Sequence, residues 1–99
     1  MEIIRMKTDD TETLSIIGRI DTITSPQLQT VLVEAISLCE KVELDFAEVS
    51  YVSSAGLRVL LMGQKSANTA EKKMIVKNIS SQVMEVLNIT GFSGILNIV

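Results

Sequence analysis

The chain has 99 residues, a net charge of −3 and a hydrophobic content of 46%. This length is typical of a single domain, which we expect to span residues 1–99. The acidic balance and the low aromatic content of 3% argue against a nucleic-acid partner, because nucleic-acid modules usually carry basic patches and stacking aromatic rings. The chain has no histidine and a single cysteine, so it predicts neither an internal disulfide nor a Cys/His metal site. Cys39 is interpreted as a small buried hydrophobe.

The N-terminal residues 1–5 show no charged segment followed by an apolar leader. No apolar run approaches the roughly 20 residues that a membrane-spanning helix needs. We therefore expect a soluble cytoplasmic protein with no membrane partner.

The first half of the chain predicts a hairpin, a helix and a strand. Residues 2–8 and 13–20 read as two strands whose short polar link suits an antiparallel hairpin. Thr24-Ser25-Pro26 then gives a hydroxyl N-cap followed by proline at the first helical position. Residues 42–46 alternate apolar and acidic side chains, which predicts a strand that ends near Phe46. The helix before this strand carries one apolar stripe at helical spacing, made of Leu28, Val31, Leu32, Ala35, Ile36 and Cys39.

The second half predicts two more helices and two short strands. A loop with several serines leads into a helix from about Ser54 to Asn68, and residues 74–76 form an apolar run typical of a buried strand. Ser80 or Ser81 is expected to cap a third helix, which Gly91 can end. Residues 95–99 are predicted to form a last short strand.

The order of these elements predicts the fold class. Helices and strands alternate after the hairpin, which indicates an α/β domain with a mixed, mostly parallel sheet. The half-polar alternation in residues 42–46 differs from the continuous apolar strands of a doubly wound sheet. We therefore expect the helices to lie mainly on one face.

The turn Ser53-Ser54-Ala55-Gly56-Leu57 is the candidate working part. A serine pair before a helix is common capping chemistry, and either hydroxyl is placed to accept a free backbone N–H. Gly56 is unusual there, because glycine costs about 1 kcal/mol relative to alanine inside a helix. We expect something to approach the backbone closely at this point. Residues 57–62 are apolar except for Arg58, so an outward-facing apolar patch would mark a binding surface.

The segment resembles the signature of STAS domains, the family of bacterial anti-sigma factor antagonists. In that family a strand ends in Asp or Asn, and a short turn leads to Asp-Ser-Ser-Gly-Leu at the start of a helix. Asp45 stands at the strand position, residues 53–57 at the turn, and residues 59–61 on the helix. Gly18-Arg19-Ile20-Asp21 is similar to the family's Gly-x-Leu-Asp ahead of the first helix. The order of elements agrees over nearly the whole chain, which implies a single STAS-like domain.

The resemblance implies a phosphorylation cycle. An anti-sigma factor that is also a serine kinase would bind the unmodified protein, release a sigma factor, and phosphorylate Ser54 to end the binding. A phosphatase would restore the binding. Neither a cofactor nor a metal is implied, and self-association is left open. The residues implied to meet the partner are Asp21, Ser53, Ser54, Ala55, Gly56, Leu57 and Arg58.

Alternatives remain open at several of these residues. Ser53 stands where the family has an acid, and Ala55 replaces the second serine, so Ser53 is a rival phosphate acceptor. The missing acid favours a second interpretation without the cycle, a constitutive subunit of a transporter or a stressosome-like assembly. Asp21 is alternatively a turn or helix-dipole residue, and Asp45 a solvated residue on the polar strand face.

Two further expectations follow from what the chain lacks. An enzyme is disfavoured, because there is no histidine and a seryl nucleophile needs an adjacent base. The chain stops at Val99, where many members of the family continue into a further helix. We therefore expect the last strand to be less well covered, with an effect on stability or dimerisation.

Overall fold

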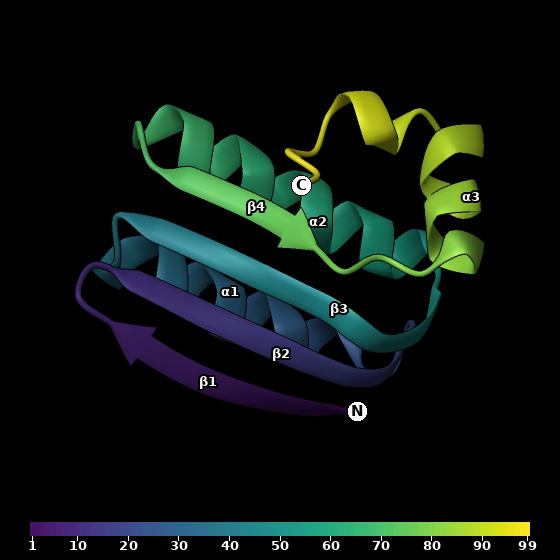
Figure 1. Ribbon diagram of the computed structural model, residues 1–99, viewed down its shortest axis with the longest axis horizontal. Coiled ribbons are helices and arrows are strands. Elements are labelled where there is room, and N and C mark those ends of the chain that lie inside the picture. Colours follow the sequence, from purple (N-terminus) through teal and green to yellow (C-terminus); the bar gives the residue numbers. More distant parts are fainter.

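The computed structural model describes residues 1–99, which form a four-stranded sheet in the order β1-β2-β3-β4, three α-helices and one short 3-10 helix (Figure 1). Strands β1 and β2 are antiparallel, and β3 and β4 continue the sheet in parallel. The predicted mixed, mostly parallel sheet opened by a hairpin is confirmed. The elements in chain order are β1 (Glu2–Thr8), β2 (Thr11–Ile20), α1 (Ser25–Leu38), β3 (Lys41–Val52), α2 (Ser54–Thr69), β4 (Lys73–Lys77), α3 (Ser81–Ile89) and η1 (Phe92–Gly94).

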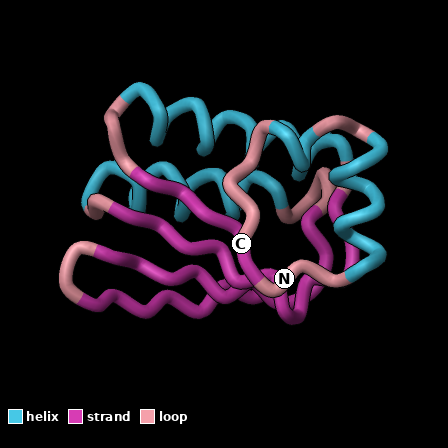
Figure 2. Tube along the Cα trace, turned by 45° about the horizontal axis from the view of Figure 1, so that its top comes forward, coloured by secondary structure: helices cyan, strands magenta, loops and turns pink.

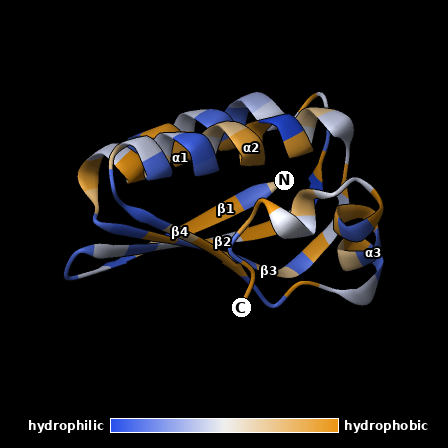
Figure 3. Ribbon diagram, turned by 90° about the horizontal axis from the view of Figure 1, so that it is seen from above, coloured by the Kyte–Doolittle hydropathy of each residue, from blue (hydrophilic) through white to orange (hydrophobic).

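Helices α1 and α2 lie side by side on one face of the sheet, and α3 lies at one end of it, beside the last part of β3 (Figure 3). The predicted placement of the helices mainly on one face is therefore confirmed. The core fills the space between the two layers. Aliphatic side chains dominate it, as the composition indicates, and a fully buried side chain of this size contributes about 1.5–3 kcal/mol. Its largest fully buried members include Phe46, Leu14, Leu32, Leu44, Leu60 and Leu87.

The hairpin turn is tighter than predicted. Only Asp9 and Asp10 lie between the strands, and Asp9 has a φ of 53°, a left-handed conformation that aspartate tolerates better than most residues. Glu12, expected in the link, is instead a buried residue of β2. Its carboxylate accepts hydrogen bonds from Arg5 Nε at 2.6 Å and Arg5 Nη2 at 3.2 Å. The other guanidinium nitrogen lies 2.8 Å from Glu34 Oε1, which ties the edge strand to α1.

Strand β3 continues to Val52, so the predicted end near Phe46 is wrong. The pairing of β2 with β3 is irregular between Ser15 and Ile17 and again between Gly18 and Arg19. These irregularities break the alternation of buried and exposed residues after Phe46, and that alternation was the signal on which the prediction relied.

The predicted last strand at residues 95–99 is also wrong. The chain forms η1 and then a loop that returns to the sheet (Figure 2). It makes one isolated bridge, in which Val76 N–H donates to Asn97 O at 2.9 Å and Val99 N–H donates to Val76 O at 3.1 Å. Gly91 does end α3 as predicted, with a φ of 81° that glycine adopts without strain. None of the three helices has the length and apolar character that crossing a bilayer requires.

Candidate functional site

The carboxyl ends of β2 and β3 lie side by side and bring two loops together. Ile20 pairs with Val52, and the backbone N–H of Ser53 donates to Ile20 O at 2.8 Å. The loop that begins at Asp21 leads into α1, and the turn at Ser53 leads into α2. Both predicted parts of the site therefore meet at the carboxyl ends of the parallel strands, where α/β folds commonly bind their ligands.

The two serines of the turn have different roles. Ser53 is the N-cap of α2, and its hydroxyl accepts a hydrogen bond from Gly56 N–H at 3.3 Å. Its carbonyl accepts from Leu57 N–H at 2.9 Å. Ser54 is the first residue of the helix, is exposed, and makes no side-chain hydrogen bond within the chain. The open choice between the two caps is thus settled for Ser53, and the Ser54 hydroxyl is left free.

Gly56 is glycine because the chain itself approaches it. A Cβ at this position would lie 2.8 Å from Ile20 Cγ2, 3.0 Å from Ile20 O and 3.0 Å from Val52 Cγ1. These distances are too short for any side chain, so Gly56 lets α2 pack directly on the ends of β2 and β3. The expected close approach is real, but it comes from the fold's own strands.

The outer face of α2 is less apolar than the sequence suggested. Leu57 and Val59 are only 7% and 6% exposed and belong to the core, so they form no exposed patch. The buried side of α2 packs against α1, β3 and β4. Leu61 and Met62 are half-buried, and they are the apolar side chains left on the outside.

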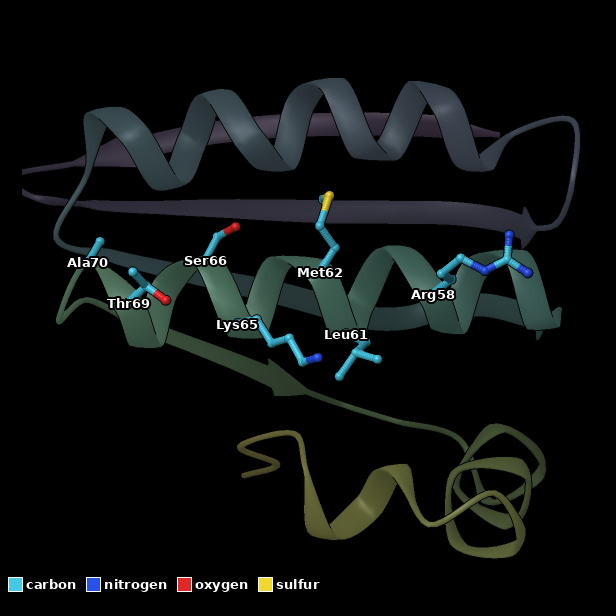
Figure 4. Close-up of a pocket in the computed structure, with 7 residues that line it drawn as sticks. All are labelled: Arg58, Leu61, Met62, Lys65, Ser66, Thr69 and Ala70. Atoms are coloured by element: carbon cyan, nitrogen blue, oxygen red, sulfur yellow. The ribbon is translucent and has the colours of Figure 1, made fainter.

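Two shallow hollows flank this face. The outer hollow runs along α2 with a volume of about 580 Å³, and its lining residues are drawn in Figure 4: Arg58, Leu61, Met62, Lys65, Ser66, Thr69 and Ala70. The interhelix hollow, of about 420 Å³, lies between the starts of α1 and α2 and is lined by Thr22, Ser25, Pro26, Gln29, Ala55, Arg58, Val59 and Met62. Arg58 belongs to both hollows, and no carboxylate lines either one.

Asp21 organises the loop before α1. Its Oδ1 accepts hydrogen bonds from the backbone N–H groups of Ile23 and Thr24, each at 3.0 Å. These bonds, that of Thr24 foremost, hold the pKa of Asp21 below its usual range. Arg19 Nε lies 3.7 Å from Asp21 Oδ2, and the Arg19 guanidinium stacks 4.2 Å above the Tyr51 ring. The turn role weighed for Asp21 is therefore the one that its contacts show.

The predicted hydroxyl N-cap of α1 is wrong in its chemistry. Thr24 occupies the cap position but makes no side-chain bond to the helix. Its hydroxyl accepts from Asp21 N–H at 2.9 Å and donates to Arg19 O at 2.8 Å, while the Ser25 hydroxyl donates to Asp21 O. The hydroxyls bond within the loop because Pro26 has no backbone N–H to offer and Gln27 N–H donates to Thr24 O at 3.1 Å instead.

Asp45 lies in the middle of β3, where its Oδ1 accepts from Ala47 N–H at 3.0 Å and Asn78 Nδ2 at 3.1 Å. It is therefore remote from the turn.

Ile23, which the sequence did not single out, is 88% exposed on the loop that Asp21 holds. An apolar residue between Thr22 and Thr24, in a polar loop next to the motif, is the signal that points to it.

Comparisons with known proteins agree with this geometry. The family model described as "Mlab, STAS domain" matches residues 5–98. The chain belongs to the STAS-domain family. The anti-sigma-B factor antagonist of Listeria monocytogenes is 32% identical over 99 residues, which cover 96% of this STAS chain and 86% of that relative. The putative anti-sigma factor antagonist BtrV of Bordetella bronchiseptica is likewise 32% identical over 79 residues, which cover 79% of this chain and 68% of that relative.

Two solved structures show the same fold. A putative anti-sigma factor antagonist from Thermotoga maritima has a TM-score of 0.89 at 17% identity, covering 97% of this chain and 84% of its own. The Bacillus cell fate determinant SpoIIAA in its phosphorylated form has a TM-score of 0.77 at 18% identity, covering 99% and 91%. Both likenesses extend over nearly the whole chain, and at these identities they show the fold.

Proposed function

We propose that this chain is an anti-sigma factor antagonist that binds an anti-sigma factor serine kinase and is switched off by phosphorylation of Ser54. The observation that carries the proposal is the free, exposed Ser54 hydroxyl at the start of α2, inside the turn that resembles the family signature. The 32% identity to an anti-sigma-B factor antagonist supports the same function. The chain is then the substrate of a kinase and a phosphatase in the cytoplasm, and not itself a catalyst.

The cap geometry favours Ser54 over its rival Ser53. The Ser53 hydroxyl oxygen already accepts the Gly56 N–H at 3.3 Å, so a phosphoryl group on it would replace the cap. Ser54 carries no such bond, and its hydroxyl is accessible. In the transfer, Ser54 Oγ bonds to the γ-phosphorus of ATP, the bond from that phosphorus to the bridging oxygen breaks, and ADP leaves together with the hydroxyl proton.

The added charge acts on binding and leaves the fold intact. A phosphate brings about −1.5 to −2 charges, which the free N–H groups at the start of α2 tolerate. Against a partner that covers this surface, the same charge has to lose its water. A buried unpaired charge costs several kcal/mol, while about 1.4 kcal/mol changes affinity tenfold. One phosphate is therefore enough to end the binding.

The proposed contact surface is formed by exposed and half-buried residues of both loops. Asp21, Ser53, Ser54, Ala55 and Arg58 reach the surface, and we add Ile23 to them. Gly56 and Leu57, which the resemblance includes, are buried and support the turn from beneath.

Phosphate mapping tests the proposal. The purified chain is incubated with ATP and a kinase-type anti-sigma factor from the same genome, and the product is mapped by mass spectrometry. We expect one phosphate, on Ser54, and none in the Ser54→Ala variant, whereas Ser53→Ala remains a substrate. Binding without any phosphate on either serine contradicts the cycle. The absence of both phosphorylation and binding contradicts the proposed function as a whole.

Ile23 offers a test of the surface that is independent of phosphate. Truncating a side chain that fills a partner's pocket typically costs more than 1 kcal/mol. We expect Ile23→Ser to weaken kinase binding about tenfold. The urea midpoint should not change, because the side chain is exposed in the free protein. An unchanged affinity in calorimetry removes Ile23 from the proposed surface.

A constitutive interaction subunit, in a transporter or a stressosome-like assembly, is the second candidate, and the serine at position 53 in place of the family's acid favours it. Ser54→Asp separates the two. A switch loses its partner when this charge is added, whereas a static adaptor that binds through another surface keeps it. Binding of the Ser54→Asp variant is measured beside Ser54→Asn, which matches its size without the charge.

A further inference from the structure

We propose that Arg58 receives the phosphate of phosphorylated Ser54 on the same helix, so that the modification also withdraws Arg58 from the partner-binding surface. The inference rests on the proposed phosphorylation of Ser54 and adds a residue that reads it. It makes the switch a change at two positions, a charge gained at Ser54 and a guanidinium withdrawn one turn later.

The spacing brings the two side chains together. Ser54 and Arg58 are residues i and i+4 of α2, which lie on the same face about 6 Å apart along the axis. Helical side chains lean toward the N-terminus of their helix, so the later residue reaches back over the earlier one. In Figure 4 the Arg58 side chain extends along α2 away from Ala70, toward the turn that contains Ser54. The planar guanidinium offers a fork of donors that fits two phosphate oxygens.

Arg58 differs from the other two arginines of the chain in having no partner. Arg5 pairs with Glu12 and Glu34, and Arg19 pairs with Asp21 and stacks on Tyr51. Arg58 is exposed and makes neither an ion pair nor a side-chain hydrogen bond. Its guanidinium is therefore available for a phosphate without breaking any contact of the fold.

The charges around Ser54 favour the same pairing. Arg58 and Lys65 are the charged residues among those that line the two hollows, and Lys65 lies about 16 Å from Ser54 along the helix. From the loop before α1, Asp21 is the neighbouring carboxylate, and the N–H groups of Ile23 and Thr24 and the Arg19 guanidinium already hold it. No unpaired carboxylate of the hollows competes for Arg58.

The pairing is also specific to position 54. Ser53 is five residues before Arg58, about 140° around the helix from it, and its oxygen caps Gly56 N–H. The chain holds a matched control at α3, where Ser81 is likewise the first residue of a helix after a serine cap. Its residue i+4 is Glu85, so a phosphate on Ser81 would meet a like charge.

Genetically encoded phosphoserine tests the pairing without any kinase. The phosphate is placed at position 54, and its second pKa is measured by phosphorus NMR at low ionic strength. We expect Arg58→Gln to raise this pKa by about 0.4, because the guanidinium stabilises the dianion. Lys65→Gln leaves the pKa unchanged. In the protein that carries phosphoserine at position 54 and retains Arg58, the Arg58 Nε–H resonance should titrate with the same pKa as the phosphate. A purely structural arginine would not give this response.

The α3 control should respond with the opposite sign. With phosphoserine at position 81, Glu85→Gln is expected to lower the phosphate pKa by a similar amount, since it removes a like charge. Equal phosphate pKa values in the position-54 protein with and without Arg58→Gln overturn the proposal, with folding verified by amide spectra. A failure of the kinase to modify Ser54 overturns the proposed function instead, because the encoded phosphate does not depend on it.

Discussion

Two helices of this domain begin with the same pair of residues and the same cap. Ser53 accepts the N–H of Gly56 at 3.3 Å at the start of α2, and Ser80 accepts the N–H of Val83 at 3.3 Å at the start of α3. A second, exposed serine follows each cap, Ser54 in α2 and Ser81 in α3. Capping chemistry therefore does not distinguish the two turns.

The surroundings of the second serine do distinguish them. Ser54 lies next to the Asp21 loop, with the unpaired Arg58 one turn later, and the α2 helix packs so tightly on β2 and β3 that only glycine fits at position 56. At the corresponding position of α3 the chain carries Val83, and Glu85 occupies the place of Arg58. A serine motif thus gains its proposed function from neighbours that the motif itself does not contain.

The largest expected effect on stability comes from disrupting the packing beneath the first turn of α2. Gly56→Val places side-chain atoms where a Cβ alone already lies 2.8 Å from Ile20 Cγ2, and overpacking of this kind costs about 1–3 kcal/mol. We expect the urea midpoint to fall accordingly. Gly94→Ala is the control, because a Cβ at Gly94 meets nothing within 4 Å and should leave the midpoint nearly unchanged. Equal midpoints would show that α2 does not need its glycine.

The next prediction compares a paired arginine with the unpaired one. Arg5→Gln leaves the Glu12 carboxylate, which is 5% exposed, without its ion pair, and should cost about 1–2 kcal/mol of unfolding free energy after allowance for the partly exposed Arg5. Arg58→Gln should cost almost nothing, since Arg58 has no partner in the fold. A comparable loss in both variants would give Arg58 a structural role and weaken its assignment to the surface.

The ion pair between Arg5 and Glu12 predicts a pH dependence of stability. The Arg5 guanidinium holds the pKa of Glu12 below its usual value of about 4.3, so the folded state binds this proton less readily than the unfolded state. The stability gained from the pair is present above that pH and is lost as the pH falls through the folded pKa. Urea midpoints measured from pH 7 down to pH 3 should fall less in Arg5→Gln than in the parent. Parallel curves would contradict the pairing.

The smallest stability effects test the two caps directly. Ser53→Ala and Ser80→Ala each remove one bond to a helix N–H and should cost about 1 kcal/mol. Ser54→Ala and Ser81→Ala should be nearly neutral, because neither hydroxyl makes an internal hydrogen bond. A large loss in Ser54→Ala would mean that this serine holds the fold and is not free for modification.

Much of this fold is predictable from hydrophobic periodicity and capping residues. The hairpin, the three helices, β4 and the α3 cap follow from local patterns, and so does the serine N-cap at the start of α2. The long end of β3 and the C-terminal loop do not follow, because they depend on an irregular pairing with β2 and on the single bridge of Val76 to Ile98.

The sequence alone assigns candidate residues to the turn, but it does not tell which of them reach the surface. Periodicity could not tell which side of α2 faces water, because Leu57 and Val59 are buried whereas Leu61 and Met62 of the same apolar run are only half-buried. The unpaired state of Arg58 and the exposure of Ile23 likewise depend on neighbours remote in sequence. These long-range contacts decide which residues of the turn can meet a partner.

The most direct test of the central claim is the affinity of the kinase-type anti-sigma factor for two encoded phosphoproteins, measured by titration calorimetry. Phosphoserine at position 54 should weaken binding at least about 100-fold relative to the unmodified chain, equivalent to about 2.7 kcal/mol, whereas phosphoserine at position 81 should leave it within about twofold. Equal affinities of the unmodified and Ser54-phosphorylated chains would contradict the account, as would an equal loss at both positions.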